Sequence, residues 1–358
     1  MTLKMQAREV LLPVTVRDKK GVLVTSLNKS DFTLTEDSRP QVIKSFTRES
    51  NLPFRVGLLV DTSRSVSSAL DNERKAASKF VDLMLPADQK SGAQSDQGFL
   101  IHFDSEVELL QDFTNSREKL HREIDDLGPT RGSSNSSQGP ETSGDDRNDR
   151  GGQSRGSRGR GGTQLYDAIY LAADELMKPK DGRKALVVFS DGGDRGSKET
   201  LNDAVDAADR ANLAVYTVYF KGEEEHNGFG NGYPGSGGGG RHGGMGGGGY
   251  PGGGGGYPGG GGGGRRNPTT ESGVDGKKIM QKIAERTGGR FFEAKKKDSL
   301  EEIYNQIAEE LRGQYLLSYT PDVVDNEGNF HKIALKANKD DLQVVTREGY
   351  YAPGGDSK

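Results

Sequence analysis

The chain has 358 residues, enough for about two domains, and its composition excludes several classes of protein. Its 49 lysines and arginines are outweighed by 53 acidic residues, giving a net charge of −4, so a dedicated DNA-binding protein is not expected. With no cysteine there can be no disulfide or thiolate metal site, and five scattered histidines leave little material for a zinc site.

The N-terminal segment indicates neither a membrane span nor a secretory signal. No stretch of the chain approaches the roughly 18–20 uninterrupted apolar residues that a transmembrane helix needs. Charges at Lys4, Arg8 and Glu9 precede any sizeable apolar run, which is not the order of a secretory signal. We therefore expect either a protein that is not exported or a sequence from which the signal has been removed.

The first fifty residues are predicted to form β-strands, because short alternating or β-branched segments are separated by turn residues. These segments are Leu11–Val16, Val22–Val24, Phe32–Glu36 and Gln41–Phe46.

Residues 51–312 show strands alternating with helices, which predicts an α/β fold with a Rossmann-like, doubly wound and mostly parallel sheet. The predicted strands are Phe54–Val60, Gly98–Phe103, Val107–Phe113, Ala185–Ser190, Ala214–Phe220 and Gly289–Glu293. The predicted helices are Ser68–Leu85, Ser116–Leu127, Gln164–Met177, Lys198–Ala211, Asp275–Thr287 and Asp298–Arg312. Only three residues join the second strand to the third, too few for a crossover helix, so one antiparallel edge strand is expected.

Two low-complexity insertions interrupt this region, at residues 129–162 and 221–273. The first is rich in Ser, Gly, Arg and Asp, and the second holds most of the glycine, with 25 of the 53 glycines between residues 227 and 264. Neither composition can bury a core, so both are predicted to be mobile loops. The Arg-Gly tract at residues 155–162 is typical of RNA-contacting segments, but a solvated loop is the preferred interpretation and RNA is an unlikely partner.

The C-terminal segment is again predicted to be β, with strands at Tyr315–Tyr319, Phe330–Lys336 and Leu342–Arg347. We expect residues 1–50 and 313–353 to pair into one discontinuous, β-sandwich-like domain, with residues 51–312 inserted between its halves and residues 354–358 a disordered tail. Two unrelated β appendages are the alternative.

Oxygen-bearing side chains gather where three predicted elements meet one edge of the sheet. Asp61, Ser63 and Ser65 follow a buried strand directly, Thr163 opens a helix, and Asp191 follows another buried strand. In open α/β sheets, ligands bind at the carboxyl ends of the strands. Two carboxylates and three hydroxyls suit a hard divalent cation such as Mg²⁺ or Mn²⁺ with an open coordination position. A cluster of helix N-cap residues is the alternative interpretation.

This arrangement resembles the von Willebrand factor type A (VWA) domain, a fold shared with the inserted domains of integrins. The metal-ion-dependent adhesion site (MIDAS) of that family consists of Asp-x-Ser-x-Ser with a distal Thr and a distal Asp. The resemblance implies that Asp61, Ser63, Ser65, Thr163 and Asp191 take the five ligand roles. Asp194 fits a turn or N-cap position better and is left out of the set.

The flanking segments narrow the resemblance to the acidobacterial-type VWA-related bacterial proteins. It rests on VTVRD at residues 14–18, LNKSDF at 27–32, Glu36-Asp37, YLLSYTP at 315–321 and REGYYAP at 347–353, and it extends from about Leu11 to Pro353. Members of that group are usually exported. The resemblance thus implies a periplasmic, surface or secreted location, although a cytoplasmic one stays open.

The resulting hypothesis is a non-enzymatic module that binds proteins in a cation-dependent manner, with a partner's Asp or Glu carboxylate completing the coordination. The two insertions are expected to flank the metal and select the partner. A second, weaker hypothesis is that displacement of the helix Asp298–Arg312 couples occupancy of the metal site to the β segments. The alternatives are a metal-dependent hydrolase acting on phosphate or ester substrates and a structural assembly component with a purely structural metal.

Overall fold

The computed structural model describes residues 9–48, 52–87, 95–128, 162–221, 275–295, 299–323, 325 and 327–352. Nearly all of both low-complexity insertions lies outside the described residues. The same is true of the predicted helix N-cap at Asp298 and of the C-terminal tail.

A six-stranded sheet forms the centre of the α/β region and confirms the predicted fold class. Its spatial order is β10-β9-β8-β5-β6-β7. The strands are β5 (Phe54–Asp61), β6 (Gln97–Phe103), β7 (Val107–Thr114), β8 (Arg183–Ser190), β9 (Leu213–Phe220) and β10 (Phe291–Ala294). Every neighbouring pair is parallel except β6 and β7, which form the expected antiparallel hairpin. All eight residues of β5 are buried, as a strand covered on both faces requires.

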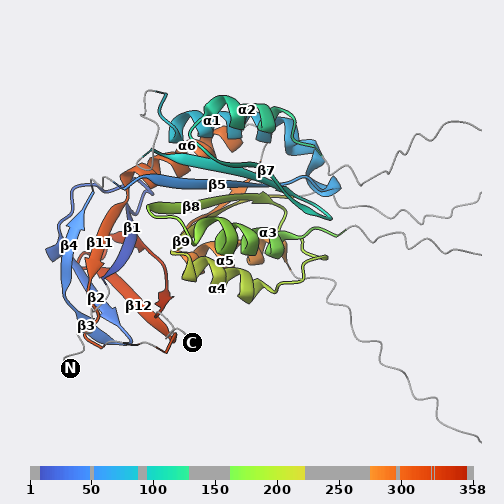
Figure 1. Cartoon of the computed structure of the whole chain (residues 1–358). Coiled ribbons are helices and arrows are strands. Elements are labelled where there is room, and N and C mark those ends of the chain that lie inside the picture. The colour runs from blue at the N-terminus through green and yellow to red at the C-terminus, as the bar shows by residue number, and fades with distance from the viewer. Residues whose placement is uncertain are drawn as a thin grey trace, which may run out of the picture. The chain divides into compact units, whose positions relative to one another are not determined.

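Helices cover both faces of this sheet (Figure 1). One layer contains α1 (Leu70–Met84), α2 (Arg117–Asp125) and α6 (Ser299–Gly313), and the other contains α3 (Leu165–Leu171), α4 (Leu201–Arg210) and α5 (Gly276–Thr287). Each layer packs against its own face of the sheet and forms a separate apolar core. The alternating strands and helices of the sequence therefore produce the doubly wound arrangement that they predict.

Two of the helices adjoin a segment of another helical type. A 3-10 helix, Arg64–Ala69, precedes α1, so the α-helical turns begin at Leu70 rather than Ser68. Beyond α3 the chain continues as a π-helix over Ala172–Met177. Single turns with π-type hydrogen bonds are not visible in a periodicity of 3.6 residues, which explains why the sequence indicates one uninterrupted helix.

The order of the strands defines where a ligand site can form. Numbered along the chain from β5 to β10, the strands lie in the order 3-2-1-4-5-6, and the direction of winding reverses between β5 and β8. At such a switch point the loops leaving two adjacent strands diverge to opposite faces and open a crevice at the carboxyl edge. Asp61 ends β5 and Asp191 follows β8, so both lie at this crevice.

Two antiparallel four-stranded sheets are built from both ends of the chain, in the orders β13-β1-β11-β4 and β14-β12-β2-β3. Their strands are β1 (Val10–Asp18), β2 (Phe32–Glu36), β3 (Arg39–Gln41), β4 (Ile43–Thr47), β11 (Tyr315–Tyr319), β12 (Phe330–Ala337), β13 (Leu342–Val345) and β14 (Gly349–Tyr351). N-terminal β1 pairs with C-terminal β11, and N-terminal β2 pairs with β12. A third apolar core, including Leu12, Leu34 and Leu317, belongs to these strands.

Three strand predictions in this region need correction. Val22–Val24 is not a strand, because only one isolated bridge joins Leu23 to Arg17. The predicted Gln41–Phe46 strand is two strands, since β3 pairs with β2 whereas β4 pairs with β11. The chain changes sheets at Val42, whose side chain is 78% exposed. A final strand, β14, was not predicted, because its three residues are too few to show alternation.

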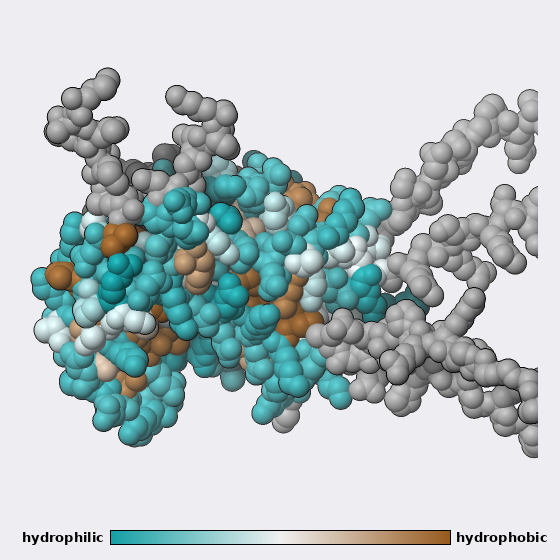
Figure 2. Space-filling model, turned by 90° about the horizontal axis from the view of Figure 1, so that it is seen from below, coloured by the Kyte–Doolittle hydropathy of each residue, from teal (hydrophilic) through white to brown (hydrophobic). Residues whose placement is uncertain are grey.

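The described residues contain no helix that is both long enough and apolar enough to span a bilayer. The face shown in Figure 2 is mainly hydrophilic, with hydrophobic residues confined to smaller areas. Large exposed apolar side chains such as Val22, Leu83 and Phe330 come from separate elements.

Candidate metal centre

Asp61 is the buried carboxylate at the centre of the candidate site. It is the last residue of β5 and is 0% exposed. Its Oδ1 accepts a hydrogen bond from the backbone N–H of Ser63 at 2.9 Å. Its Oδ2 accepts one from the hydroxyl of Ser190, on neighbouring β8, at 2.7 Å. Both oxygens are thus fixed by neutral donors.

The two serines of the motif lie beside this carboxylate. Ser63 occupies the N-cap position of the 3-10 helix and Ser65 lies in its first turn. Their hydroxyl oxygens are 3.1 Å apart and hydrogen-bonded to each other. In a continuing strand, side chains two residues apart would also lie on one side, but the extended backbone would carry them away from Asp61. The tight turn keeps both hydroxyls close to it.

Asp191 lies in the loop that leaves β8, and close backbone packing holds this loop in place. Its Oδ1 accepts a hydrogen bond from the N–H of Gly193 at 2.9 Å. Gly192 has a φ of 73° and approaches the first turn of α5 so closely that an added Cβ would lie 2.2 Å from the carbonyl oxygen of Gly276. Only glycine permits both that conformation and that distance.

Thr163 lies immediately before α3, in a segment that packs against the same loop. Its carbonyl oxygen accepts hydrogen bonds from the N–H groups of Arg195 at 3.0 Å and Gly196 at 3.3 Å. An added Cβ at Gly162 would meet the carbonyl carbon of Arg195 at 2.9 Å, so these backbones are in direct contact. The structure therefore brings the segment of Thr163 to the loop of Asp191. No hydrogen bond joins the Thr163 side chain to the other four residues within the described segments.

Asp194 has the capping role that the sequence favoured for it. Its Oδ2 accepts hydrogen bonds from the N–H of Tyr166, in the first turn of α3, at 3.1 Å and from the Ser197 hydroxyl at 2.6 Å. This carboxylate orders the start of α3.

Burial raises the pKa of Asp61 to about 6, the hydrogen bonds from Ser63 and Ser190 lower it, and the nearby charge of Asp191 raises it. Among the described residues, no lysine, arginine or histidine forms an ion pair with Asp61. A buried anion without a cationic side chain is unfavourable by itself. The side-chain atoms gathered here that could bind a metal ion are all oxygen atoms, so the residues present fit a hard divalent cation.

Two hydroxyl groups at this site were not singled out from the sequence. Ser190 donates to Asp61 and accepts from the N–H of Gly192 at 3.0 Å, so it ties β5 to the loop of Asp191. The sequence indicates a role for Ser190 only through its position, one residue before Asp191 at the end of a strand. Thr62 has a buried hydroxyl for which the described residues offer no hydrogen-bond partner.

No family model matches the chain, and no curated protein matches it. Several solved structures are similar. An aerotolerance-related membrane protein from Bacteroides fragilis is 16% identical, with 72% of this chain and 98% of that chain covered and a TM-score of 0.40. Proximal thread matrix protein 1 from the mussel byssus, solved with a zinc-occupied MIDAS motif, is 11% identical, covering 73% and 48%, with a TM-score of 0.43. The VWA domain of SpRpn10 is 10% identical, covering 71% and 95%, with a TM-score of 0.37.

The strand order, the single antiparallel edge strand and the two helix layers give residues 54–313 the doubly wound, mostly parallel α/β fold that the sequence predicts.

Proposed function

We propose that the chain is a protein-binding module that depends on a divalent cation. In this proposal Asp61, Ser63, Ser65, Thr163 and Asp191 hold Mg²⁺ or Mn²⁺ at the switch point of the sheet. The observation that carries it is the Asp61 carboxylate, which is fully buried, bonded to neutral donors and placed beside two adjoining serine hydroxyls.

The cation would be held largely by neutral hydroxyls and would stay electrophilic, so an Asp or Glu carboxylate of a partner protein would complete its coordination. The residues of the chain supply the fixed frame for this. Ser190 and the N–H of Ser63 hold the Asp61 carboxylate in one orientation, and the packing of Gly192 against Gly276 fixes the backbone that carries Asp191.

The remaining features belong to the same proposal. We propose that the module acts by binding and not by catalysis, and that it belongs with the exported acidobacterial-type VWA-related proteins that its flanking segments resemble.

His102, on β6 in the same sheet, is bonded to Glu108 at 3.0 Å and to the Gly128 carbonyl at 3.2 Å, which favours a packing role over that of a general base. The predicted selectivity role of the two insertions lies outside the described residues.

The metal can be tested by calorimetric titration of the full chain with Mg²⁺. We expect one bound ion in the wild type and a strong loss of affinity in Thr163→Ala. Ser67→Ala is the matched control, because its hydroxyl lies in the same 3-10 helix but bonds to the carbonyl of Arg64 at 2.8 Å. Equal affinity in Thr163→Ala and Ser67→Ala would contradict the ligand set.

Partner binding is tested separately, by capture from envelope and secreted fractions of the native organism in Mg²⁺ or in EDTA. We expect a partner that is retained by the wild type in Mg²⁺, is released by EDTA and is not retained by Thr163→Ala. A parallel screen of model phosphate and carboxylate esters addresses catalysis. Mg²⁺-dependent turnover that Asp61→Ala abolishes would contradict a pure binding function.

A further inference from the structure

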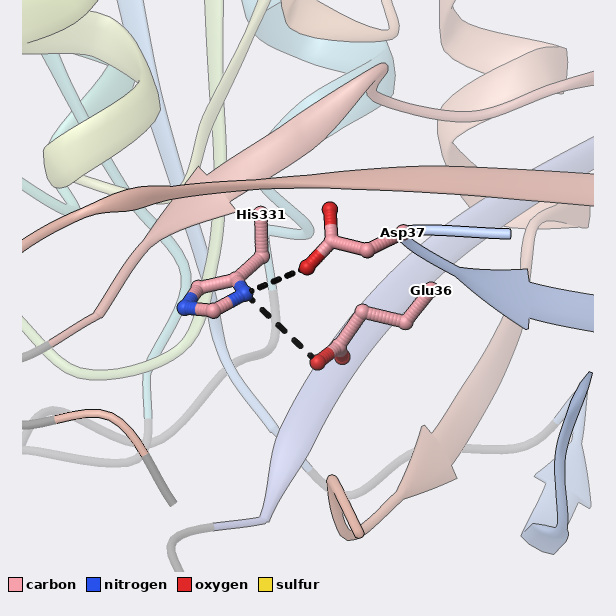
Figure 3. Close-up of side chains that lie close together, drawn as sticks. All are labelled: Glu36, Asp37 and His331. Atoms are coloured by element: carbon pink, nitrogen blue, oxygen red, sulfur yellow. Dashed lines mark hydrogen bonds and ion pairs between the residues drawn. The ribbon is translucent and has the colours of Figure 1, made fainter. Parts of the chain in front are cut away.

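A second group of side chains of metal-ligating types lies in the sheet β14-β12-β2-β3, where the sequence indicated no metal site. Glu36 ends β2, Asp37 follows it in the β2–β3 turn, and His331 is the second residue of β12. Figure 3 shows both carboxylates pointing toward the same ring nitrogen of His331. The His331 Nδ1 is 2.8 Å from Asp37 Oδ2 and 3.7 Å from Glu36 Oε1. One oxygen from each carboxylate and one histidine nitrogen all lie within 4.8 Å of one another.

The convergence of Glu36 and Asp37 depends on the turn. Consecutive side chains of a strand point to opposite faces of the sheet, so neighbours in sequence do not normally share a site. Asp37 has a φ of 47° and Ser38 a φ of 68°, the pair of left-handed conformations typical of a tight hairpin turn. The strand therefore ends at Glu36, and the turn directs Asp37 to the same histidine.

Each of the three side chains is held by its other polar atom. The His331 Nε2 contacts Asp325 Oδ2 at 3.0 Å. The Asp37 Oδ1 accepts a hydrogen bond from the N–H of Lys332 at 2.9 Å. The Glu36 Oε2 accepts hydrogen bonds from the hydroxyls of Tyr319 at 2.6 Å and Tyr350 at 3.3 Å. A carboxylate on the far nitrogen of a histidine is the usual partner of a metal-bound imidazole, because it fixes the tautomer with its lone pair toward the metal.

The group stays net negative even with a protonated imidazole. Three carboxylates surround one imidazole, which carries at most one positive charge, and Arg39 approaches Asp37 only at 4.0 Å. Glu36 is 1% exposed, and both hydroxyl hydrogen bonds that it accepts go to its Oε2. If the Nε2 proton points to Asp325, the lone pair of Nδ1 faces two carboxylate oxygens, which is repulsive unless a positive species lies between them.

We propose that Glu36, Asp37 and His331 form a binding site for a divalent transition-metal ion of the zinc class, with Asp325 as the residue that orients the histidine. One imidazole nitrogen with two carboxylate oxygens favours a borderline ion such as Zn²⁺ over Mg²⁺, which prefers oxygen alone. Bonds of about 2.0–2.2 Å would require Nδ1 and Asp37 Oδ2 to separate by a few tenths of an ångström. Asp37 can make that adjustment because its side chain is 35% exposed.

The test measures Zn²⁺ bound to the full-length chain after equilibrium dialysis. Asp61→Ala is used as the parent so that the site at the central sheet cannot contribute. We expect about one Zn²⁺ per chain in this parent and none in Asp61→Ala with His331→Gln. Asp325→Asn, which leaves all three donors in place, should weaken the affinity by roughly 10–100-fold.

His121→Gln in the same parent is the matched control, because His121 also lies near a carboxylate, 3.4 Å from Asp82, but on an unrelated surface. It should leave Zn²⁺ uptake unchanged. Circular dichroism and the Zn²⁺-dependent rise in Tm of each variant report whether the β-sheets are intact. Folded parent protein that binds no Zn²⁺, or uptake that His331→Gln leaves intact, would overturn the proposal. So would a His331 that carries protons on both nitrogens in saturating Zn²⁺, as observed by NMR.

Discussion

The two candidate metal centres of this chain are built in opposite ways. At the central sheet a single buried carboxylate, Asp61, is surrounded by hydroxyl and amide donors that carry no charge. In the sheet β14-β12-β2-β3 a single imidazole, His331, is surrounded by carboxylates. Each set includes two carboxylates, but the first completes them with hydroxyl oxygens, whereas the second completes them with an imidazole nitrogen.

This difference determines which ion each centre would select. Hydroxyl oxygens suit a hard ion such as Mg²⁺ and leave it electrophilic and open to an external ligand, whereas an imidazole nitrogen favours a borderline ion such as Zn²⁺. We therefore expect Mg²⁺ at the central sheet to serve binding and Zn²⁺ at His331 to stabilise the β-sheets.

The largest expected effect is the loss of Mg²⁺ binding in Asp61→Ala. The variant removes one of the two carboxylates in the set, and the one that is fully buried at its centre, so affinity should fall by about 1,000-fold or more. Glu36→Gln, a matched change at the other centre, should leave Mg²⁺ affinity within about twofold. Calorimetric titration measures both, and comparable losses in the two variants would mean that the centres are not distinct.

Glu73 on α1 provides a buried carboxylate that belongs to neither centre. Burial raises its pKa to about 8, and the hydrogen bond from Tyr304 on α6 lowers it. Because the folded pKa lies above the unfolded value of 4.5, the folded state holds the extra proton, and stability should fall as the pH rises from about 5 to 8.

Glu73→Gln should abolish that decline and make the protein more stable than the wild type above pH 8, by roughly 2–4 kcal/mol. Urea unfolding at pH 5 and pH 9 measures this difference. Asp71→Asn, a change to an exposed residue two positions away on the same helix, is the control. A wild-type stability that rises over the same pH range would disprove the assignment.

Ser190→Ala tests whether the hydroxyl that joins β5 to the Asp191 loop positions the metal ligands. It removes the donor to Asp61 and leaves the N–H of Gly192 without its acceptor, so the free energy of unfolding should fall by about 1–3 kcal/mol. Mg²⁺ affinity should fall about tenfold. Ser105→Ala, an exposed hydroxyl after β6, should change neither quantity. Unchanged affinity in Ser190→Ala would remove Ser190 from the account.

The smallest effects are expected from the two tyrosines that hold Glu36. Tyr319→Phe should lower stability by about 1–2 kcal/mol, because its buried hydroxyl donates to the carboxylate at 2.6 Å. Tyr350→Phe should cost only about 0.5 kcal/mol, since its bond is 3.3 Å long. Thermal unfolding without metal compares them. The reverse order would show that Tyr350, not Tyr319, positions Glu36.

The two centres also differ in how far the sequence predicts them. Asp61, Ser63 and Ser65 lie within five residues after a continuous apolar strand, so local pattern alone indicates both the strand end and the donors. Thr163 and Asp191 are distant, but each adjoins a predicted element whose end lies at the same edge of a parallel sheet. Four of the six sheet strands were predicted to within one residue at each end, whereas β8 begins two residues before and β10 two residues after its predicted start.

The His331 centre had no comparable signal. Glu36 and Asp37 meet His331 and Asp325 only because β2 pairs with β12 across nearly 300 residues, and long-range pairing leaves no local periodicity. For the same reason, the sequence does not indicate the hydrogen bond between Tyr319 and Glu36. Tyr304 and Tyr319 each donate a hydrogen bond to a buried carboxylate that is distant in the sequence.

The most direct test of the central claim is a crystal structure of the full chain grown with Mn²⁺, with data collected for anomalous scattering. The account predicts one anomalous peak at the carboxyl edge of the sheet, with the hydroxyl oxygens of Ser63, Ser65 and Thr163 at about 2.2 Å. A map with no peak there, while Mn²⁺ is bound elsewhere in the same crystal, would contradict it.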